Sequence, residues 1–483
     1  MDKIAIRKID EVYNKIECDP SVAYELNDYF TFDVPGAKFM PAVRNKFWDG
    51  KIRLFQLLTG YIYGGLNRYV EEFCKSRNYE IEYISNFASD EFSVKEAKEF
   101  IDKIKPTMQP RDYQLEAFVH AIRERRALML SPTASGKSFI IYLITRYYHA
   151  RTLIIVPTTS LVSQLASDFT DYGFVSDRYV HRIFAGQDKQ TDKPITISTW
   201  QSIYKMPKEY FQQFDVVIGD EAHLFKAKSL TSILSKLDNC RYRFGFTGTL
   251  DGTQTHKLVL EGLFGPVRKV TTTAELIEQK HLADFKIKAI VLSYPDEVRK
   301  MISRASDYQA EMDYIVRLEA RNKFITNLTL SLEGNTLLLF QFVEKHGKVL
   351  CDMIKKEAGD RKVFYVSGEV DGEDREEIRR IVEKEKDSII VASFGTFSTG
   401  VNIRNLHNVI FASPSKSKIR NLQSIGRGLR KSDSKDSATL YDIADDLSWK
   451  QKKNYTLLHF MERIKIYNEE KFEYKIYKVN LII

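Results

Sequence analysis

Short apolar runs alternate with amphipathic stretches from Arg111 onward. Strands that are buried on both faces read as continuous apolar runs, and the helices between them cover those faces, so this rhythm predicts parallel β-sheets. The first series of runs is ALMLSP, TLIIVP, ITIST, VVIGDEAH and YRFGFTGT. The second series is NTLLLF, KVFYVSG, SIIVASF and NVIFAS, and residues 296–333, between the series, have a helical pattern. The pattern predicts an α/β protein with two lobes in tandem, joined near residues 275–295.

The two ends of the chain have other patterns. Aromatic segments punctuated by Gly and Pro, FTFDVPG and KFWDGKIRLFQLLTGYIYGG, predict hairpins, and helical patterns follow at 67–80 and 93–105. The segment after Ser448 is rich in Lys and aromatic residues, mainly helical in pattern, and ends in the strand-like YKIYKVNLII. We therefore expect a small α+β domain (1–106), a first lobe (107–280), a second lobe (281–447) and a short helical C-terminal segment (448–483).

Composition narrows the class of protein. The 483 residues are 43% hydrophobic and 29% charged, which excludes a wholly disordered or fibrous chain. No apolar stretch reaches the ~18 residues of a membrane span, and the first residues lack the apolar core of a secretory signal. The four cysteines form no CxxC pair, so we expect reduced thiols and a cytoplasmic protein without membrane contact.

The net charge of +8 is unevenly distributed. Residues 401–483 hold 16 basic and 9 acidic residues, residues 38–77 hold 8 and 3, and residues 1–33 hold 4 and 8. Two basic regions that also carry aromatic residues are typical of a protein with a polyanionic partner. Charge alone is equally compatible with an ordinary solvated surface.

A candidate phosphate site follows the ALMLS run. Residues 131–138 match the motif GxxxxGK[ST], except that Ser131 stands in place of the first glycine and Pro132–Ser138 make up the rest. The apolar helical stretch FIIYLITRYY comes next. A loop that leads into a helix N-terminus offers backbone N–H groups and a positive dipole end to phosphate oxygens. We expect the loop to cradle phosphates, Lys137 to reach the β- and γ-phosphates and Ser138 to bind Mg²⁺. The loop residues concerned are Thr133, Ala134, Ser135 and Gly136.

A pair of carboxylates follows the fourth apolar run, in VVIGDEAH. Ligands bind beyond the carboxyl ends of strands in open α/β sheets, which is where Asp220 and Glu221 would lie. We expect Asp220 to hold Mg²⁺ and Glu221 to orient and deprotonate the attacking water. The pair could instead cap the next helix, but together with the phosphate loop it predicts nucleotide hydrolysis.

These segments resemble the motifs of superfamily 2 helicases, and seven motifs agree in order over residues 110–431. The resemblance implies two RecA-like lobes, ATP as cofactor together with Mg²⁺, and adenine recognition by Arg111 and Gln114. It implies coupling between ATP and nucleic acid by His223, Thr247, Thr249 and Gly400. It also implies nucleic-acid contacts at Pro157, Thr158, Thr199, Gln201 and Thr396.

The segment QSIGRGLR resembles the motif that supplies arginine fingers, and Gln423, Arg427 and Arg430 would take that role. Arginine offers a planar fork of donors that stays charged, which suits the charge that develops on a transferring phosphoryl group. Arg427 and Arg430 are three apart, so on a helix they share one face. The plainer alternative is a basic helix face at the surface.

Four further strings, NKFWDGKIRLF, VFYVSGEVD, FSTGVNIRNLH and KSKIRNLQSIGRGLRK, resemble phage recombination helicases across nearly the whole chain. That family consists of ATP-driven motors that act on branched DNA in recombination, repair and replication: Holliday junctions, stalled forks, D-loops and R-loops. The resemblance implies a monomer in the bacterial host cytoplasm, with recombination or single-strand-binding proteins as further partners.

The basic regions contain our candidate DNA contacts. Trp48 could stack on an exposed base while Lys51 and Arg53 contact phosphates from one strand face, with Ile52 and Leu54 packed inward. Alternatively, Phe47 and Trp48 are core residues of the small domain. In the second basic region, Lys416 and Lys418 are the candidates.

Other functions remain open beside a branched-DNA helicase. They are an RNA or RNA–DNA helicase, the motor subunit of a restriction system, and a non-catalytic nucleic-acid-binding protein with a degenerate ATPase. The complete set of Lys137, Glu221, Arg427 and Arg430 weighs against the last alternative.

Overall fold

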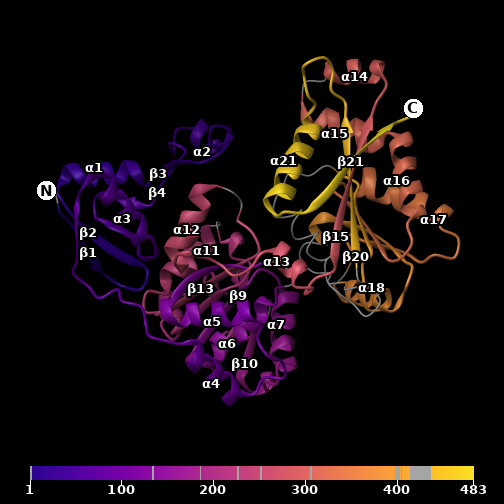
Figure 1. Cartoon of the computed structure of the whole chain (residues 1–483). Helices are drawn as coiled ribbons and strands as arrows, with labels where there is room; N and C mark the ends of the chain where they lie inside the picture. Colours follow the sequence, from indigo (N-terminus) through magenta and orange to yellow (C-terminus); the bar gives the residue numbers. More distant parts are fainter. Residues whose placement is uncertain are drawn as a thin grey trace. The chain divides into compact units, whose positions relative to one another are not determined.

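The structure is a computed structural model that describes residues 3–132, 135–184, 187–225, 228–250, 253–304, 307–370, 372–396, 403, 405–413 and 437–483. The chain passes from one compact unit to a second between Val270 and Thr271 (Figure 1). The first unit holds a small N-terminal sheet and a large parallel sheet, and the second unit holds another large parallel sheet.

Among the described residues, the large sheet of the first unit has seven strands in the order β10-β11-β9-β12-β13-β8-β14, all paired in parallel. The strands are β8 (Arg126–Leu130), β9 (Thr152–Val156), β10 (Val180–Ile183), β11 (Ile195–Thr199), β12 (Val216–Gly219), β13 (Tyr242–Thr247) and β14 (Val267–Lys269). All five predicted apolar runs are strands of this sheet. The sequence pattern missed the short outermost strands β10 and β14.

Helices cover both faces of this sheet. Successive residues of β9 alternate: Ile154 and Val156 point into one core and Leu153 and Ile155 into the other. The first core is closed by α4 (Val94–Ile104), α5 (Asp112–Glu124), α6 (Lys137–Tyr148) and α7 (Thr159–Asp171). The second is closed mainly by α11 (Lys228–Lys236) and α12 (Gln254–Phe264). Burial on both faces explains why the strands read as continuous apolar runs.

The N-terminal sheet is small and mixed, in the order β5-β6-β2-β1-β7. It contains β1 (Lys3–Lys8), β2 (Tyr13–Glu17), β5 (Phe55–Gln56), β6 (Tyr61–Tyr63) and β7 (Glu80–Tyr83), and it packs with α1 (Pro20–Tyr29) and α3 (Asn67–Arg77). Only β1 and β7 pair in parallel within it. The predicted α+β character of this region is confirmed.

This small sheet is fixed tightly to α12 of the first lobe. The Tyr69 hydroxyl donates to Glu261 Oε2 over 2.6 Å, and the Glu11 N–H donates to the Asp238 carbonyl over 2.9 Å. A Cβ atom on Gly65 would lie 1.8 Å from the Glu261 carbonyl oxygen, so no larger residue fits this contact. The N-terminal sheet and the first lobe are therefore closely packed against each other.

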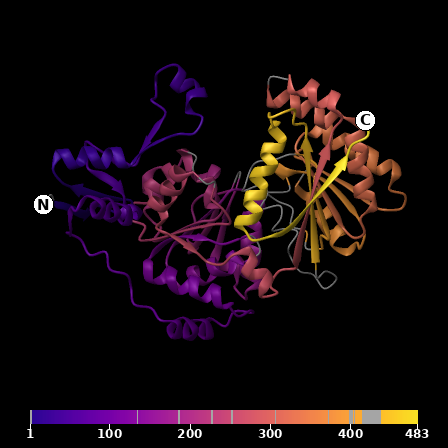
Figure 2. The same ribbon diagram turned by 45° about the horizontal axis from the view of Figure 1, so that its top comes forward.

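A hairpin projects from the N-terminal sheet, as two views show (Figures 1 and 2). Its strands β3 (Thr31–Asp33) and β4 (Lys51–Arg53) pair in antiparallel fashion, and the short helix α2 (Pro41–Arg44) lies in the connection. Ile52 and Leu54 pack toward the domain core as predicted, while Lys51 and Arg53 are exposed. Phe47 is 84% exposed, so the core alternative for this residue is wrong.

The second unit contains seven described parallel strands in the order β17-β18-β16-β19-β20-β15-β21. They are β15 (Asp284–Ser293), β16 (Thr336–Phe340), β17 (Val363–Val366), β18 (Ile389–Ser393), β19 (Asn408–Phe411), β20 (Ser437–Asp446) and β21 (Glu473–Asn480). The helices include α14 (Asp296–Ser303), α15 (Tyr308–Arg317), α16 (Glu319–Ser331), α17 (Lys348–Glu357), α18 (Gly372–Lys384) and α21 (Tyr455–Glu469). The four apolar runs of the second series, the helical stretch 296–333 and the C-terminal strand are confirmed. The C-terminal strand adds to the edge of this same sheet, next to β15.

The sequence pattern missed the two long strands in this sheet, β15 and β20. The first half of β15 alternates between exposed and buried residues, so it is not an apolar run. In β20, Asp442 and Asp445 are fully buried. Asp442 accepts hydrogen bonds from Arg463 and Tyr467, so a polar side chain is tolerated inside the core.

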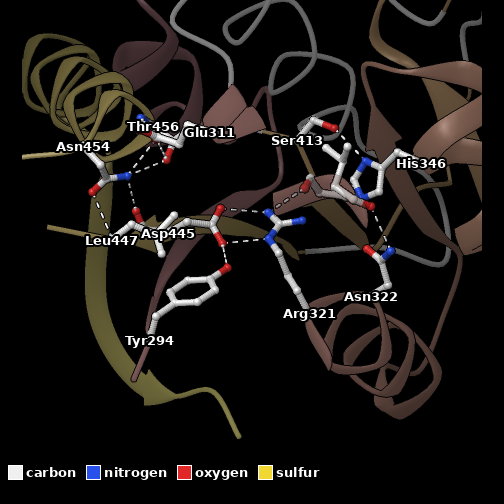
Figure 3. Close-up of polar contacts among 12 residues, drawn as sticks. Tyr294, Glu311, Arg321, Asn322, His346, Ser413, Asp445, Leu447, Asn454 and Thr456 are labelled. Atoms are coloured by element: carbon white, nitrogen blue, oxygen red, sulfur yellow. Dashed lines mark hydrogen bonds and ion pairs between the residues drawn. The ribbon is translucent and has the colours of Figure 1, made fainter. Parts of the chain in front are cut away.

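Asp445 is the centre of a second buried polar network (Figure 3). Arg321 donates to both carboxylate oxygens of Asp445, over 2.7 and 2.9 Å, and Tyr294 donates to Oδ1 over 2.7 Å. Arg321 also donates to the Ala412 carbonyl over 2.9 Å. The network thus ties α16 to the carboxyl ends of β15, β19 and β20.

The four cysteines, Cys18, Cys74, Cys240 and Cys351, are free thiols, as predicted. Within the described ranges, we find no helix long and apolar enough to cross a membrane.

Candidate active site

Residues from three segments of the sequence gather at the carboxyl edge of the first large sheet. The phosphate loop follows β8, the carboxylates Asp220 and Glu221 follow β12, and Thr247 ends β13. Since β13 lies between β8 and β12, its last residue separates the loop from the carboxylates. The carboxyl edge is where open α/β sheets bind ligands.

The described part of the candidate phosphate loop contains one backbone conformation that favours glycine, at Gly136. Gly136 adopts φ of +78°, which favours glycine, and a Cβ there would lie 2.4 Å from Gln114 Nε2. The Gln114 amide donates to the Gly136 carbonyl over 3.3 Å and accepts from the Arg111 N–H over 2.9 Å. The predicted adenine segment is therefore joined directly to the loop. Thr133 and Ala134 lie outside the described residues.

Serine is compatible with position 131 for a simple reason. The Ser131 N–H donates to the Thr247 carbonyl over 2.8 Å, which extends the pairing of β8 with β13 by one residue. Extended backbone does not need glycine. The replacement of the first motif glycine therefore leaves the entry into the loop regular.

Lys137 forms ion pairs with both carboxylates. Its Nζ lies 2.8 Å from Glu221 Oε1 and 3.7 Å from Asp220 Oδ1. Burial raises the pKa of Asp220, against the opposing effect of the Lys137 charge. Burial by itself would lower the pKa of Lys137, but the two carboxylates outweigh it and raise that pKa. The ammonium thus stays charged beside the two carboxylates.

Glu221 has a left-handed backbone with φ of +52°, which is uncommon for a residue with a side chain. The Asp220 carboxylate accepts from the Glu221 N–H over 2.9 Å and so supports this turn. Local strain of this kind is concentrated at functional sites. The turn leaves both neighbouring carboxylates within ion-pair distance of Lys137.

Side chains between Glu221 and β13 lie close together. His223 Nδ1 lies 3.4 Å from Glu221 Oε2 and 3.0 Å from the Thr247 hydroxyl. That hydroxyl also donates to the Thr249 carbonyl over 2.8 Å. Hydrogen bonds therefore link three predicted coupling residues, His223, Thr247 and Thr249, and His223 lies beside Glu221.

Predicted nucleic-acid contacts lie on the same edge of the sheet. Thr158 follows β9 and accepts from the Leu161 N–H as the N-cap of α7, and Pro157 precedes it. Thr199 ends β11 and is buried, while Gln201, two residues on, is exposed. In the second unit, the Thr396 hydroxyl accepts from Ser393 Oγ over 2.8 Å just after β18.

Several predicted residues lie outside the described part of the chain. They are Gly400, Lys416, Lys418, Gln423, Arg427 and Arg430. The arginine-finger and second-lobe DNA roles of these residues therefore stay predictions.

The oxygen donors fit a magnesium ion. Mg²⁺ is usually held by one or two protein oxygens together with phosphates and water. Ser138 provides a hydroxyl and Asp220 a carboxylate at the same sheet edge. Among the residues with described positions, no group of three or more His, Cys, Asp and Glu side chains could hold a metal by itself.

One contact of the site has no signal in the sequence. The Tyr172 hydroxyl lies 2.7 Å from Ser138 Oγ, although the two residues are 34 positions apart. Tyr172 follows α7, and only the packing of α7 against α6 brings it to the loop.

Two parallel sheets of this kind, with phosphate-loop and DEAH residues at the carboxyl edge of the first, define the class of superfamily 2 helicases. Family models match three regions: "DNA helicase UvsW, N-terminal" over residues 3–84, "Type III restriction enzyme, res subunit" over 107–252 and "Helicase conserved C-terminal domain" over 319–432.

The chain is 39% identical to the ATP-dependent DNA helicase uvsW of Enterobacteria phage T4, over 97% of both chains. The crystal structure of T4 UvsW has a TM-score of 0.53 and 36% identity, covering 99% of this chain and 100% of that one. The DNA 3'-5' translocase XPB2 of Sulfurisphaera tokodaii is 27% identical over 68% of this chain and 80% of its own. This chain belongs to the UvsW family of helicases, and it is an ATP-dependent enzyme of superfamily 2.

Proposed function

We propose that this helicase is an ATP- and Mg²⁺-driven DNA motor that remodels branched DNA, such as Holliday junctions, stalled forks, D-loops and R-loops, in recombination, repair and replication. The observation that carries the proposal is a cationic and aromatic hairpin, residues 31–53, outside the two helicase lobes. A motor that only follows a single strand does not need such an element.

The tip of the hairpin combines apolar and cationic side chains in solvent. Phe39 is 73% exposed and Phe47 84% exposed. Exposed cations surround them, namely Lys38, Arg44, Lys46, Lys51 and Arg53. Trp48 is half-buried and its indole N–H donates to the Lys51 carbonyl over 2.9 Å, which orders the base of the tip. Aromatic rings stack on unpaired bases and cations bind phosphates, so the tip suits the branch point of a DNA junction.

We propose the following chemistry for the site. Arg111 and Gln114 recognise adenine, and Thr133, Ala134, Ser135, Gly136 and Lys137 bind the phosphates. Ser138 and Asp220 hold Mg²⁺, which when bound neutralises charge on the β- and γ-phosphates. Glu221 activates water, while Gln423, Arg427 and Arg430 stabilise the transferring phosphoryl group.

We further propose that His223, Thr247, Thr249 and Gly400 couple hydrolysis to DNA. Pro157, Thr158, Thr199, Gln201, Thr396, Lys416 and Lys418 contact the strand that the motor follows. The functional division is the one expected above, with 1–106 as the junction-contacting part, 107–280 and 281–447 as the motor and 448–483 as a C-terminal extension. We propose a monomer that works in the host cytoplasm beside recombination or single-strand-binding proteins.

A substrate panel tests the substrate class. ATPase activity is measured without nucleic acid and with linear duplex, single-stranded DNA, RNA and a four-way junction. Unwinding is measured on the base-paired substrates. We expect the highest turnover with branched DNA. Preference for RNA would instead indicate an RNA helicase, and translocation on linear duplex without unwinding would indicate a restriction-type motor.

The variant Lys51→Ala with Arg53→Ala tests the hairpin. Each lost phosphate contact flattens the log–log salt dependence of binding by about 0.9, so the slope for a junction should fall by up to ~2. Arg7→Ala with Lys15→Ala removes the same charge from exposed positions of the same domain and should leave the slope unchanged. An unchanged slope in the Lys51/Arg53 variant would refute the junction-contact role.

A further inference from the structure

A tyrosine outside every helicase motif contacts the serine of the phosphate loop. The Tyr172 hydroxyl is 2.7 Å from Ser138 Oγ, close enough for a strong hydrogen bond in either direction. Ser138 has one hydroxyl proton to donate and two lone pairs to offer. The direction of that proton therefore decides which way the lone pairs point.

The Tyr172 ring is held in place from several sides. Its centroid lies 4.9 Å from the Phe139 ring and 5.4 Å from the Tyr142 ring, both on α6 just after Ser138. Its main-chain N–H donates to the Asp168 carbonyl over 3.0 Å, and its carbonyl accepts from the Thr107 N–H over 3.3 Å. The hydroxyl is thus presented to Ser138 by a fixed ring rather than by a mobile side chain.

The phenol oxygen is also able to accept a hydrogen bond, since a tyrosine hydroxyl is both a donor and an acceptor. A serine oxygen that binds a cation must direct a lone pair toward the cation. Its hydroxyl proton then points away from the cation and can donate a hydrogen bond to another acceptor. Tyr172 offers that acceptor on the side of Ser138 that faces α7.

We propose that Tyr172 is a positioning residue that orients the Ser138 hydroxyl for Mg²⁺. The inference rests on the proposed role of Ser138 as a metal ligand. Tyr172 acts through Ser138, in the way that the partners of metal ligands commonly fix the ligand geometry.

The test is Tyr172→Phe in the full-length chain, which removes one oxygen and keeps the ring. Binding of fluorescent ADP is titrated with Mg²⁺, so that the readout does not depend on hydrolysis. The loss of one hydrogen bond should weaken Mg²⁺ binding about threefold to tenfold. ADP affinity without Mg²⁺ and the melting temperature should stay unchanged. Tyr179→Phe, a matched change at another partly buried tyrosine of the same lobe, should have no effect.

A double-mutant cycle with Ser138→Ala separates the possible outcomes. If the effect of Tyr172→Phe disappears in the Ser138→Ala background, the two residues act as one unit. If the two effects add, Tyr172 acts independently of Ser138 and the inference is overturned. It is also overturned if Ser138→Ala weakens Mg²⁺ binding and Tyr172→Phe does not. If Ser138→Ala leaves Mg²⁺ binding intact, the proposed metal site itself is wrong.

Discussion

At the scale of single residues, the site is arranged around the charge of Lys137. Its ammonium bonds to Glu221 and lies near Asp220, so it offsets part of the negative charge of two carboxylates that would be costly to bury alone. Phosphate oxygens can replace the carboxylates as partners of Lys137. Nucleotide binding would then free Glu221 for water.

Two substitutions test this exchange. Lys137→Ala should abolish ATP hydrolysis and weaken nucleotide binding, because it removes a cation that contacts phosphate. Glu221→Gln should lower the rate of ATP hydrolysis by at least about 100-fold, the usual contribution of a general base. The variant should still bind ATP. Steady-state turnover and fluorescent-nucleotide binding distinguish the two. Near-normal turnover in either variant would exclude the assigned roles.

His346 should make the stability of the second unit fall at acid pH. Burial lowers the pKa of His346 well below 6.5, and the nearby Arg321 charge acts in the same direction. Its Nδ1 lies 3.0 Å from Ser413 Oγ, and burial favours the neutral ring in the folded state. The unfolded chain binds a proton below pH 6.5 that the folded chain does not, so stability falls as the pH falls.

We expect a loss of up to ~1.4 kcal/mol of unfolding free energy per pH unit below the ordinary histidine pKa, from this residue alone. Urea unfolding between about pH 7.5 and 5.5 measures the slope. His346→Asn keeps a polar side chain and should flatten the slope relative to the parent. An identical slope in both proteins would mean that His346 does not titrate on unfolding.

At the scale of elements, buried ion pairs hold the long strands of the second sheet. Arg321 and Asp445 are both completely buried, and their pairing joins α16 to β20 (Figure 3). The Ala412 carbonyl, just beyond β19, is bound by the same guanidinium. A buried pair contributes little net stability compared with apolar residues, but losing one partner leaves an uncompensated charge.

Arg321→Met should therefore destabilise the fold by about 3–5 kcal/mol. Arg321→Met combined with Asp445→Leu should regain most of the loss, and adding Tyr294→Phe should regain more, because it removes the hydroxyl that Asp445 bound. Thermal and urea unfolding measure the series. If the double variant is as unstable as Arg321→Met, the loss of stability does not come from the unpaired charge of Asp445.

At the scale of the whole molecule, each unit has hydrophobic clusters of its own. Among the described residues, the clusters given for the N-terminal sheet and the first lobe reach as far as Val270, and two clusters of the second unit contain residues from Ala289 onward. The N-terminal sheet shares the core of the first lobe at Val12, Tyr63 and Val259. A sheet docked in this way moves with the first lobe.

We therefore expect residues 1–270 to fold as an independent fragment. It should bind ATP, because the residues proposed to bind adenine and the phosphates lie within it, but hydrolyse it at background rates, because the predicted arginine fingers are absent. Circular dichroism melting and nucleotide binding test this. An unfolded fragment would contradict the independence of its core, and rapid DNA-stimulated turnover would contradict the arginine-finger role.

The sequence by itself determined the fold class, the main strands of both large sheets and the strand ends at which the candidate nucleotide site lies. Local rules suffice there: strands buried on both faces must be apolar, and a phosphate loop needs glycine, lysine and a hydroxyl at fixed spacing. These rules failed where burial depends on a partner far away in the chain. Asp442 and Asp445 lie inside β20 only because Arg463 and Arg321 neutralise them.

Only the tertiary structure decided three further features. It placed Phe47 in solvent, since exposure depends on where the hairpin projects and not on residue type. It joined the N-terminal sheet to α12 through contacts that leave no space for a side chain on Gly65. It brought Tyr172 to Ser138, because helix packing and not sequence spacing sets distances between side chains on different helices.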